Sequence, residues 1–396
     1  MNWLDSLMSQ TAELESPRRY FYFAGLSVLS AIAGRKMWLD RGGAYKLYPN
    51  IYVMLVGPSG IKKGLPIRVA EKLVTELKVT KVISGRSSVQ AIIEHLGMQT
   101  MNTDGSLQKT ASAFIVSGEF SQSILDDQQA FTILTDLYDS QWKDEYTNLL
   151  KAGKSILKEV YLTMLSASNQ VHLHSVIGQR DIQGGFIART LFVNEVTRNK
   201  KNALVRQQAK IDYESLTEHL KAINLLSGEF HYTNPAADFY EDWYNIYEPD
   251  EDDNTGTNNR LPDTVLKVAM LISLSRGFDM LINIEDLQQA IEVCMDCAQS
   301  TREITEHAPS QTTNESSKNA ILIMETIVKT PEFRMARTDL IKKLWRKMNS
   351  YDISRAVESL AEAKALEEKR VDGQLVYIVG EAFLKDYLKN VKQQTH

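Results

Sequence analysis

The sequence of 396 residues contains only two cysteines, Cys294 and Cys297. Their C-x-x-C spacing also occurs in redox and metal sites, but no second pair exists to complete a zinc site. Both lie inside the helical pattern IEDLQQAIEVCMDCAQS, so we expect two half-buried thiols one helical turn apart and no metal site. So little cysteine excludes a disulfide-stabilised fold and suits a reducing cytoplasm.

Long hydrophobic runs are also missing. No stretch of 18 apolar residues occurs, which excludes a membrane-spanning helix. The opening MNWLDSLMSQ has neither the basic segment nor the apolar segment of a secretory signal. We therefore expect a cytoplasmic protein with no membrane partner.

An excess of positive charge is absent as well. The formal net charge is −5, so the chain as a whole does not attract nucleic acid. The charge is uneven, however: residues 316–396 hold 15 Lys and Arg against 11 Asp and Glu, and the remainder holds 30 against 39. Any nucleic-acid contact must come from a local patch, and the C-terminal segment is one candidate.

What the sequence does contain is a series of short β-rich runs separated by helical patterns. Ile51–Gly57 (IYVMLVG) is apolar without alternation, as expected of a strand buried on both faces. A glycine-containing loop and a helical pattern follow it, which is the opening of a β-α-β unit. Similar runs begin at Ser112, Glu159 and Thr190. This succession predicts an α/β fold around a mainly parallel sheet.

Changes of pattern along the chain predict five segments. They are an N-terminal helical segment with a hairpin over residues 1–45, a core over 46–202, a helical region with an acidic loop over 203–306, a linker over 307–317 and a last domain over 318–396. The first hairpin is placed at Gly42-Gly43. In the last domain, three helical patterns and a hairpin at Asp372-Gly373 predict a winged helix.

The loop after the first buried run carries the central motif, GPSGIKKG. The phosphate-binding pattern is G-x-x-x-x-G-K-[ST]; here Lys62 stands at the last glycine and Gly64 at the hydroxyl residue. Amide groups at a helix N-terminus and one lysine still suit a triphosphate, whereas the hydroxyl that ligands Mg²⁺ is lost. A plain Gly-Pro turn is the alternative. The predicted nucleotide-binding residues are Gly57, Pro58, Ser59, Gly60, Ile61, Lys62, Lys63 and Gly64.

Three polar residues at strand ends extend this hypothesis. Glu119 follows a buried run and can act as the base for an attacking water, or it is a solvated carboxylate at a strand end. Gly118 stands where an aspartate often holds Mg²⁺. Asn169 follows the next run and can bind the γ-phosphate or the water, or it is a turn residue. Arg189 precedes the last run, either as a surface arginine or as a cation that reaches a phosphate on a neighbouring subunit.

The order GPSGIKKG, SGEF, SASN, GGFIAR and RLPDTVLKVAM resembles AAA+ helicases. The resemblance is to phage and mobile-element replication ATPases, relatives of the minichromosome-maintenance and superfamily 3 helicases, and covers roughly residues 20–300. In the last motif Arg260 stands seven residues before Lys267, as in that family.

This resemblance implies an AAA+ core over residues 46–202 with a helical lid over 203–306. It implies that Lys63 binds phosphates, that Glu119 is the Walker B glutamate and that Asn169 is sensor 1. Arg189 would be the arginine finger and Arg260 would be sensor 2. Because a finger acts between subunits, a homo-oligomeric ring, a hexamer, follows, with ATP and Mg²⁺ as cofactors.

Two groups of basic residues are candidates for DNA contacts. Motors of this group carry a hairpin before the sensor 1 strand, and the matching segment has Gly153 at the tip between Lys151 and Lys154. Lysines repeated round a ring would line a positive channel, or they are ordinary solvated lysines. In the last domain the basic cluster includes Lys342, Lys343 and Arg346. It contacts DNA or forms a solvated face, and the domain can equally dock a protein.

Two functions are consistent with these features. The first is an ATP-dependent, ring-forming DNA helicase or translocase of phage or mobile-element replication, acting on single-stranded or forked DNA with a separate primase. The second is a nucleotide-binding but hydrolytically weak DNA-binding, loader or adaptor protein. The retained Lys63 and Glu119 favour the first, and the missing Mg²⁺ ligands favour the second.

Overall fold

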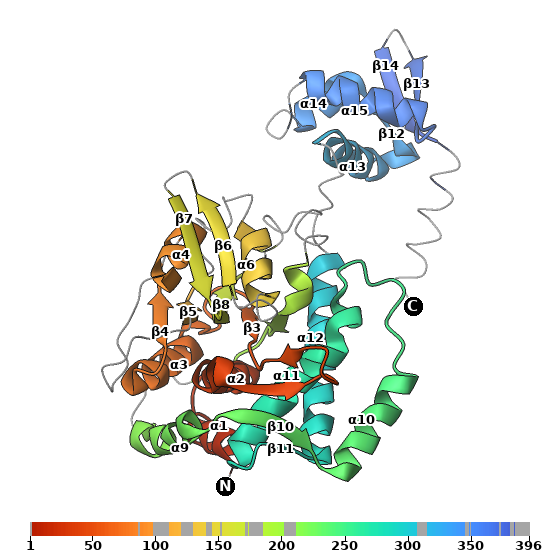
Figure 1. The fold of residues 1–396 in the computed structure, drawn as a ribbon. Coiled ribbons are helices and arrows are strands. Elements are labelled where there is room, and N and C mark those ends of the chain that lie inside the picture. Colours follow the sequence, from red (N-terminus) through yellow and green to blue (C-terminus); the bar gives the residue numbers. More distant parts are fainter. Residues whose placement is uncertain are drawn as a thin grey trace. The chain divides into compact units, whose positions relative to one another are not determined.

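The structure is a computed structural model, and it divides the chain into two compact units, residues 1–308 and 309–396 (Figure 1). The boundary falls inside the polar stretch 307–317. The residues that the structure describes are 2–85, 88–97, 111–119, 130–139, 145–150, 153–170, 173, 185–201, 211–306, 315–344, 348, 350–371, 374–380 and 384.

A sheet of five parallel strands forms the centre of the first unit. Its order is β4-β5-β8-β3-β9, so β3, the strand before the phosphate-loop motif, lies between β8 and β9. The predicted α/β fold with a mainly parallel sheet is therefore confirmed. The strands are β3 (Tyr52–Val56), β4 (Lys81–Ser84), β5 (Ser112–Ser117), β8 (Tyr161–Ser168) and β9 (Thr190–Asn194).

Hydrophobic clusters cover both faces of this sheet. Successive side chains of a strand point to opposite faces, and β3 accordingly sends Val53 and Leu55 into one cluster and Tyr52, Met54 and Val56 into the other. Figure 1 shows helices on both sides of the sheet. Burial on both faces explains why the strand sequences are apolar without alternation.

The helices of the first unit supply these two layers. The first cluster includes side chains from α1, α2, α3, α9, α10, α11 and α12, and the second includes side chains from α4 and α6. The helices are α1 (Trp3–Gln10), α2 (Arg18–Ala33), α3 (Gly64–Leu77), α4 (Val89–Gly97), α6 (Ala130–Asp139), α9 (Tyr213–Leu225), α10 (Asn234–Ile246), α11 (Thr257–Arg276) and α12 (Ile284–Glu306), with 3-10 turns η1 (Gly34–Lys36) and η3 (Ile187–Arg189). In the part of the chain described, no helix combines the length and apolarity needed to cross a bilayer.

A second sheet joins segments that the sequence pattern separates. Its order is β11-β10-β1-β2. The hairpin β1–β2 is confirmed at Gly42 and Gly43, both with positive φ. The region 203–306, expected to be helical with an acidic loop, also contains strand β10, which pairs in parallel with β1, with Met37 opposite Gly228. The strands are β1 (Met37–Asp40), β2 (Lys46–Leu47), β10 (Gly228–Tyr232) and β11 (Leu281–Ile282).

A two-stranded antiparallel hairpin precedes β8, as expected. It consists of β6 (Glu145–Leu150) and β7 (Gly153–Lys158), and Leu150 pairs with Gly153. The two-residue connection between them contains Lys151, which lies outside the described residues. Gly153 is thus the first residue of β7 and not the tip itself.

The second unit has its own hydrophobic core. Helices pack against an antiparallel sheet of order β12-β14-β13. Val371 pairs with Gln374, so the hairpin expected at Asp372-Gly373 is confirmed, although those two residues are outside the described part. The elements are α13 (Glu315–Val328), η4 (Pro331–Phe333), β12 (Arg334–Ala336), α14 (Arg337–Leu344), α15 (Ser350–Glu362), β13 (Leu366–Val371) and β14 (Gln374–Val379).

Candidate nucleotide-binding site

The loop Gly57–Gly64 begins at the carboxyl end of β3. The register of the parallel strands places Val56 opposite Ser168 of β8 and Asn194 of β9. The Gly57 N–H donates to the Ser168 carbonyl over 3.4 Å. Because the carboxyl ends of parallel strands share one edge, the loop lies where α/β proteins bind their ligands.

Close packing explains the first glycine of the motif. A Cβ at position 57 would lie 2.4 Å from the Glu195 carbonyl oxygen and 2.6 Å from the Tyr20 hydroxyl. That hydroxyl donates to the Val56 carbonyl, and burial raises the pKa of Tyr20 well above its usual range. Helix α2 therefore fixes the end of β3, a contact that the sequence pattern does not indicate.

Lys62 occupies the position of the second motif glycine and keeps the glycine conformation. Its φ is 69°, in the left-handed region that glycine favours. The Ser16 hydroxyl donates to the Lys62 carbonyl over 2.7 Å, and the Lys62 ammonium lies 3.8 Å from a Glu15 carboxylate oxygen. Lys62 therefore adopts a backbone conformation that is uncommon for a residue with a side chain.

Lys63 folds back over the loop. Its ammonium donates to the carbonyls of Gly57 at 2.6 Å and Pro58 at 2.9 Å. Burial lowers the pKa of Lys63, and the nearby Glu119 carboxylate opposes that change. The motif lysine and the predicted base are thus close enough to interact electrostatically.

The loop Gly57–Gly64 contains several backbone N–H groups without a partner among the described residues. The amides of Ser59, Gly60, Lys62, Lys63 and Gly64 donate no hydrogen bond to another described residue. Helix α3 starts at Gly64 without a side-chain cap, so its positive end is available to an anion. Free amides beside an ammonium fit the phosphates of a nucleotide.

The ligands for Mg²⁺ are less complete. Neither Gly64 nor Gly118 has a side-chain oxygen, and among the described residues no group of three or more His, Cys, Asp or Glu is placed to hold a metal. Position 64 has room for a side chain, because the nearest atom to a Cβ there is the Arg68 Nη2 at 4.0 Å. The residues present therefore suit phosphate better than the metal.

Glu119 and Asn169 lie at the same edge of the sheet as the loop. β8 separates β3 from β5, so Asn169, just after β8, stands between the loop and Glu119, two residues after β5. Glu119 is exposed, and its backbone carbonyl accepts from the Ser117 hydroxyl. Glu119 and Asn169 thus each follow a buried strand, as the sequence predicts.

Arg189 lies at the opposite edge. It directly precedes β9, whose first residue, Thr190, pairs with Tyr52 at the start of β3. Its side chain is 7% exposed, and it forms an ion pair with Asp139 at the end of α6. As placed, Arg189 binds its own chain and does not face the loop.

Arg260 belongs to the same edge as Arg189. Both cations act on Tyr138 and on Lys267 electrostatically. Arg260 is exposed near the start of α11, whereas Lys267 further along this helix is 2% exposed. The Lys267 ammonium donates to Asn50 Oδ1 at 2.8 Å and lies 3.9 Å from the centre of the Tyr138 ring.

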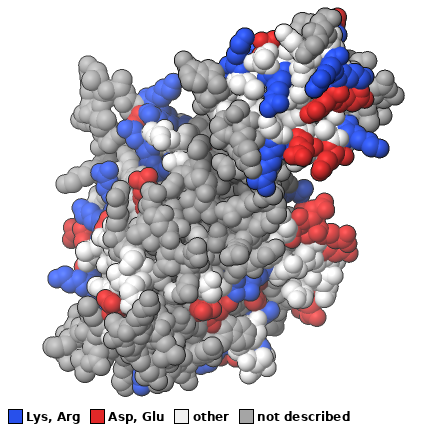
Figure 2. All heavy atoms as spheres, turned by 90° about the horizontal axis from the view of Figure 1, so that it is seen from above, with Lys and Arg blue, Asp and Glu red and all other residues white. Residues whose placement is uncertain are grey.

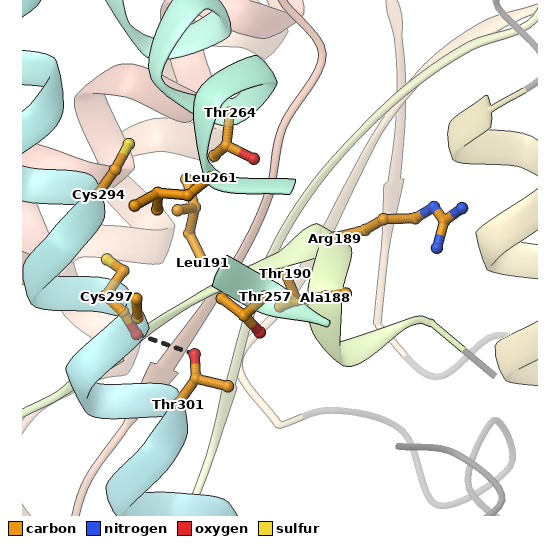
Figure 3. A pocket seen from close by; sticks show the side chains of 11 residues that line it. Ala188, Arg189, Thr190, Leu191, Thr257, Leu261, Thr264, Cys294, Cys297 and Thr301 are labelled. Carbon is orange, nitrogen blue, oxygen red and sulfur yellow. Dashed lines mark hydrogen bonds between the residues drawn. The ribbon is translucent and has the colours of Figure 1, made fainter. Parts of the chain in front are cut away.

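A small pocket separates this edge from the two cysteines. It lies between η3, α11 and α12 and has a volume of about 10 Å³, roughly the space of one water molecule. Figure 3 shows Arg189 pointing away from Cys294 and Cys297. The cysteines are fully buried, not half-buried as expected, and burial raises the pKa of Cys297 to about 12. They are inert core thiols.

The buried Lys267 gives the edge a measurable pH dependence. Burial lowers its pKa from 10.5 to about 7. Between these values the unfolded chain holds a proton that the folded chain lacks, so the wild type gains stability as the pH rises. We therefore expect the free energy of unfolding of Lys267→Met, relative to that of the wild type, to be highest below pH 7. That advantage should fall by about 1.4 kcal/mol per pH unit above pH 7.

Urea unfolding from pH 6 to pH 10 measures this difference. Lys343→Met, at an exposed position of α14, is the control for the loss of one lysine charge. Parallel stability curves for the wild type and Lys267→Met would show that the buried ammonium does not titrate in this range.

The candidate DNA-binding residues are only partly described. Lys151 and Arg346 lie outside the described residues, as does the side chain of Lys154. Lys342 and Lys343 are exposed on α14, and Lys342 lies 3.8 Å from Asp339. On the face in Figure 2, Lys and Arg are interspersed with Asp and Glu and do not form one continuous basic patch among the described atoms.

Comparisons with known proteins do not assign a family. No protein-family model matches the chain, and no curated protein matches it. The evidence for function therefore comes from the residues at the two edges of the sheet.

Proposed function

We propose that this chain is an AAA+ ATPase that binds ATP at Gly57–Gly64 and assembles into a ring that moves along DNA. The observation that carries the proposal is the carboxyl edge of the sheet. Free loop amides, the Lys63 ammonium and the Glu119 carboxylate meet there, with Asn169 between them. These are the groups that phosphate binding and water activation require.

The opposite edge supports a ring. Arg189 and Arg260 lie away from the loop of their own chain, so they can act on a nucleotide only if another subunit brings its loop to them. A homo-oligomer would provide that contact, and the resemblance to AAA+ helicases implies a hexamer. Its cofactors would be ATP and Mg²⁺, with Lys63 holding phosphate and Glu119 accepting a proton from water.

DNA is the proposed track. The hairpin β6–β7 precedes β8, the position of the pore hairpin in the helicases that the sequence resembles. Lys151 and Lys154 would contact phosphates there. The second unit, with three helices and an antiparallel hairpin, would be a winged helix that binds DNA or a replication protein. A primase would be a separate chain.

A hydrolytically weak loader or adaptor is the second candidate. Gly64 and Gly118 leave the metal short of ligands, and Arg189 is already paired, which both favour this alternative. ATP turnover with and without single-stranded DNA separates the two. DNA-stimulated hydrolysis supports the motor, whereas ATP binding with no turnover under either condition supports the loader. Failure to bind ATP would overturn both.

Restoring the missing hydroxyl should strengthen hydrolysis. Position 64 accommodates a Cβ, and a serine there can ligand Mg²⁺ as in other phosphate loops. We expect Gly64→Ser to raise ATP turnover about tenfold, the gain of one well-placed ligand, and to lower the Mg²⁺ concentration required. Gly64→Ala adds the same Cβ without the oxygen and is the matched control. Equal effects of both substitutions would show that the hydroxyl is not involved.

A further inference from the structure

The guanidinium of Arg189 has a complete set of partners within its own chain. Its Nε donates to both Asp139 carboxylate oxygens at 3.0 Å, and its Nη2 donates to Asp139 as well. The Nη1 donates to the Gly185 carbonyl at 2.7 Å. All three nitrogens are therefore engaged, and a second anion cannot bind this face while Asp139 holds it.

Gly185 leaves the space that the Arg189 side chain occupies. Gly185 has a φ of 79°, and a Cβ at this position would lie 2.5 Å from the Arg189 Nη1. Only glycine combines that backbone conformation with so close an approach. The Gly185 carbonyl that accepts from Arg189 belongs to the same short segment of the chain as Arg189 itself.

Aromatic packing fixes where Asp139 stands. The Tyr138 ring lies 4.9 Å from the Tyr52 ring at the start of β3, and Phe131 of α6 lies 4.9 Å from Phe186 beside η3. The Asn50 amide donates to the Tyr138 carbonyl over 3.2 Å. Buried contacts thus join the end of α6 to the start of β3, and the start of α6 to Phe186 beside η3. They hold the Asp139 carboxylate facing the guanidinium.

Unlike Arg189, Asp139 is accessible and has other cations nearby. Its side chain is 33% exposed, against 7% for Arg189. The Asp139 carboxylate raises the pKa of the buried Lys267, which burial lowers, so the two charges interact. If Arg189 leaves, the partly exposed Asp139 carboxylate keeps access to water, so the loss of its partner costs less than it would in a closed core.

We propose that Asp139 is a positioning residue that latches Arg189 in the isolated subunit, and that the triphosphate of a neighbouring subunit replaces its carboxylate. This inference rests on the proposed function. A carboxylate and a phosphate oxygen pair both match the planar fork of a guanidinium, so they compete for the same N–H groups. The exchange moves one ion pair from inside the subunit to the subunit boundary.

The test is ATP turnover as a function of protein concentration. Opening the latch should favour the assembled state, so Asp139→Ala should reach half-maximal turnover at about tenfold lower protein concentration, the size of one charge-assisted hydrogen-bonded interaction. Asp139→Asn should shift in the same direction by less. Asp139→Glu keeps the carboxylate and should stay near the wild type.

A double variant separates the latch from a structural role. If Asp139 acts through Arg189, Arg189→Ala with Asp139→Ala should match Arg189→Ala alone. Thermal unfolding of each variant reports whether it folds, and Asp139→Asn serves where Asp139→Ala does not. Maximal turnover that falls to the Arg189→Ala level in folded Asp139→Asn, or a midpoint that does not move, would overturn the latch. A wild type that neither binds nor hydrolyses ATP would instead overturn the proposed function, and the latch with it.

Discussion

Replacing Lys63 with alanine is expected to weaken ATP binding about 10- to 100-fold. The ammonium is the one side-chain cation of the loop that lies beside both its free amides and Glu119, and a charge-assisted contact to phosphate contributes about 1.5–3 kcal/mol. Isothermal titration with a non-hydrolysable ATP analogue measures the affinity directly. Unchanged affinity would mean that Gly57–Gly64 is only a turn.

Lys62 provides the matched control for this experiment. It belongs to the same loop and carries the same charge, but its ammonium faces Glu15. Lys62→Gly removes that charge and restores the glycine that the conformation at φ 69° favours. We expect this variant to bind ATP within a few-fold of the wild type. Equal losses in both variants would point to a general charge effect and not to a specific lysine.

Mixing two inactive variants is expected to restore turnover. Arg189→Ala should lower turnover about 1,000-fold or more, the range of an arginine that stabilises phosphoryl transfer. Lys63→Ala should leave little turnover at an ATP concentration that saturates only an intact loop. In a ring, a subunit with an intact loop can meet a neighbour with an intact arginine. Mixtures should therefore regain a substantial part of the wild-type rate.

The mixing ratio makes this result specific. Activity should be highest near equal amounts of the two variants and close to zero at either end, and the wild type mixed with Lys63→Ala shows the effect of simple dilution. Two inactive variants that stay inactive at every ratio would place Arg189 outside the site. Its ion pair with Asp139 would then be purely structural.

The part of the site that could be predicted from the sequence depends on local order. An apolar run, a glycine-containing loop and a helical pattern are contiguous. The strand expected over Ile51–Gly57 and the helix after the loop were therefore placed correctly, as Tyr52–Val56 and Gly64–Leu77. Glu119 and Asn169 follow buried strands, and parallel pairing then brings strand ends to one edge. In each case a short pattern determines the local conformation, and sheet topology does the rest.

What the sequence did not reveal is carried by distant contacts and by conformation. Tyr20 reaches the end of β3, and Asp139 pairs with Arg189, 50 residues away; neither pairing has a local signature. Lys62 departs from the residue pattern of the motif, and the pattern did not reveal that its φ lies in the left-handed region that glycine favours. The roles of Arg189 and Arg260 remain predictions, because their partners would be on another subunit.

The parallel pairing of β1 with β10 also governs when this protein can finish folding. Met37 must wait for Gly228 to be synthesised, and at 5–20 residues per second that delay is roughly 10–40 s. Until then one edge of β1 presents unpaired backbone groups, the kind of surface that chaperones cover. Strand β1 is therefore unpaired on this edge throughout the delay, although it lies between β10 and β2 in the folded protein.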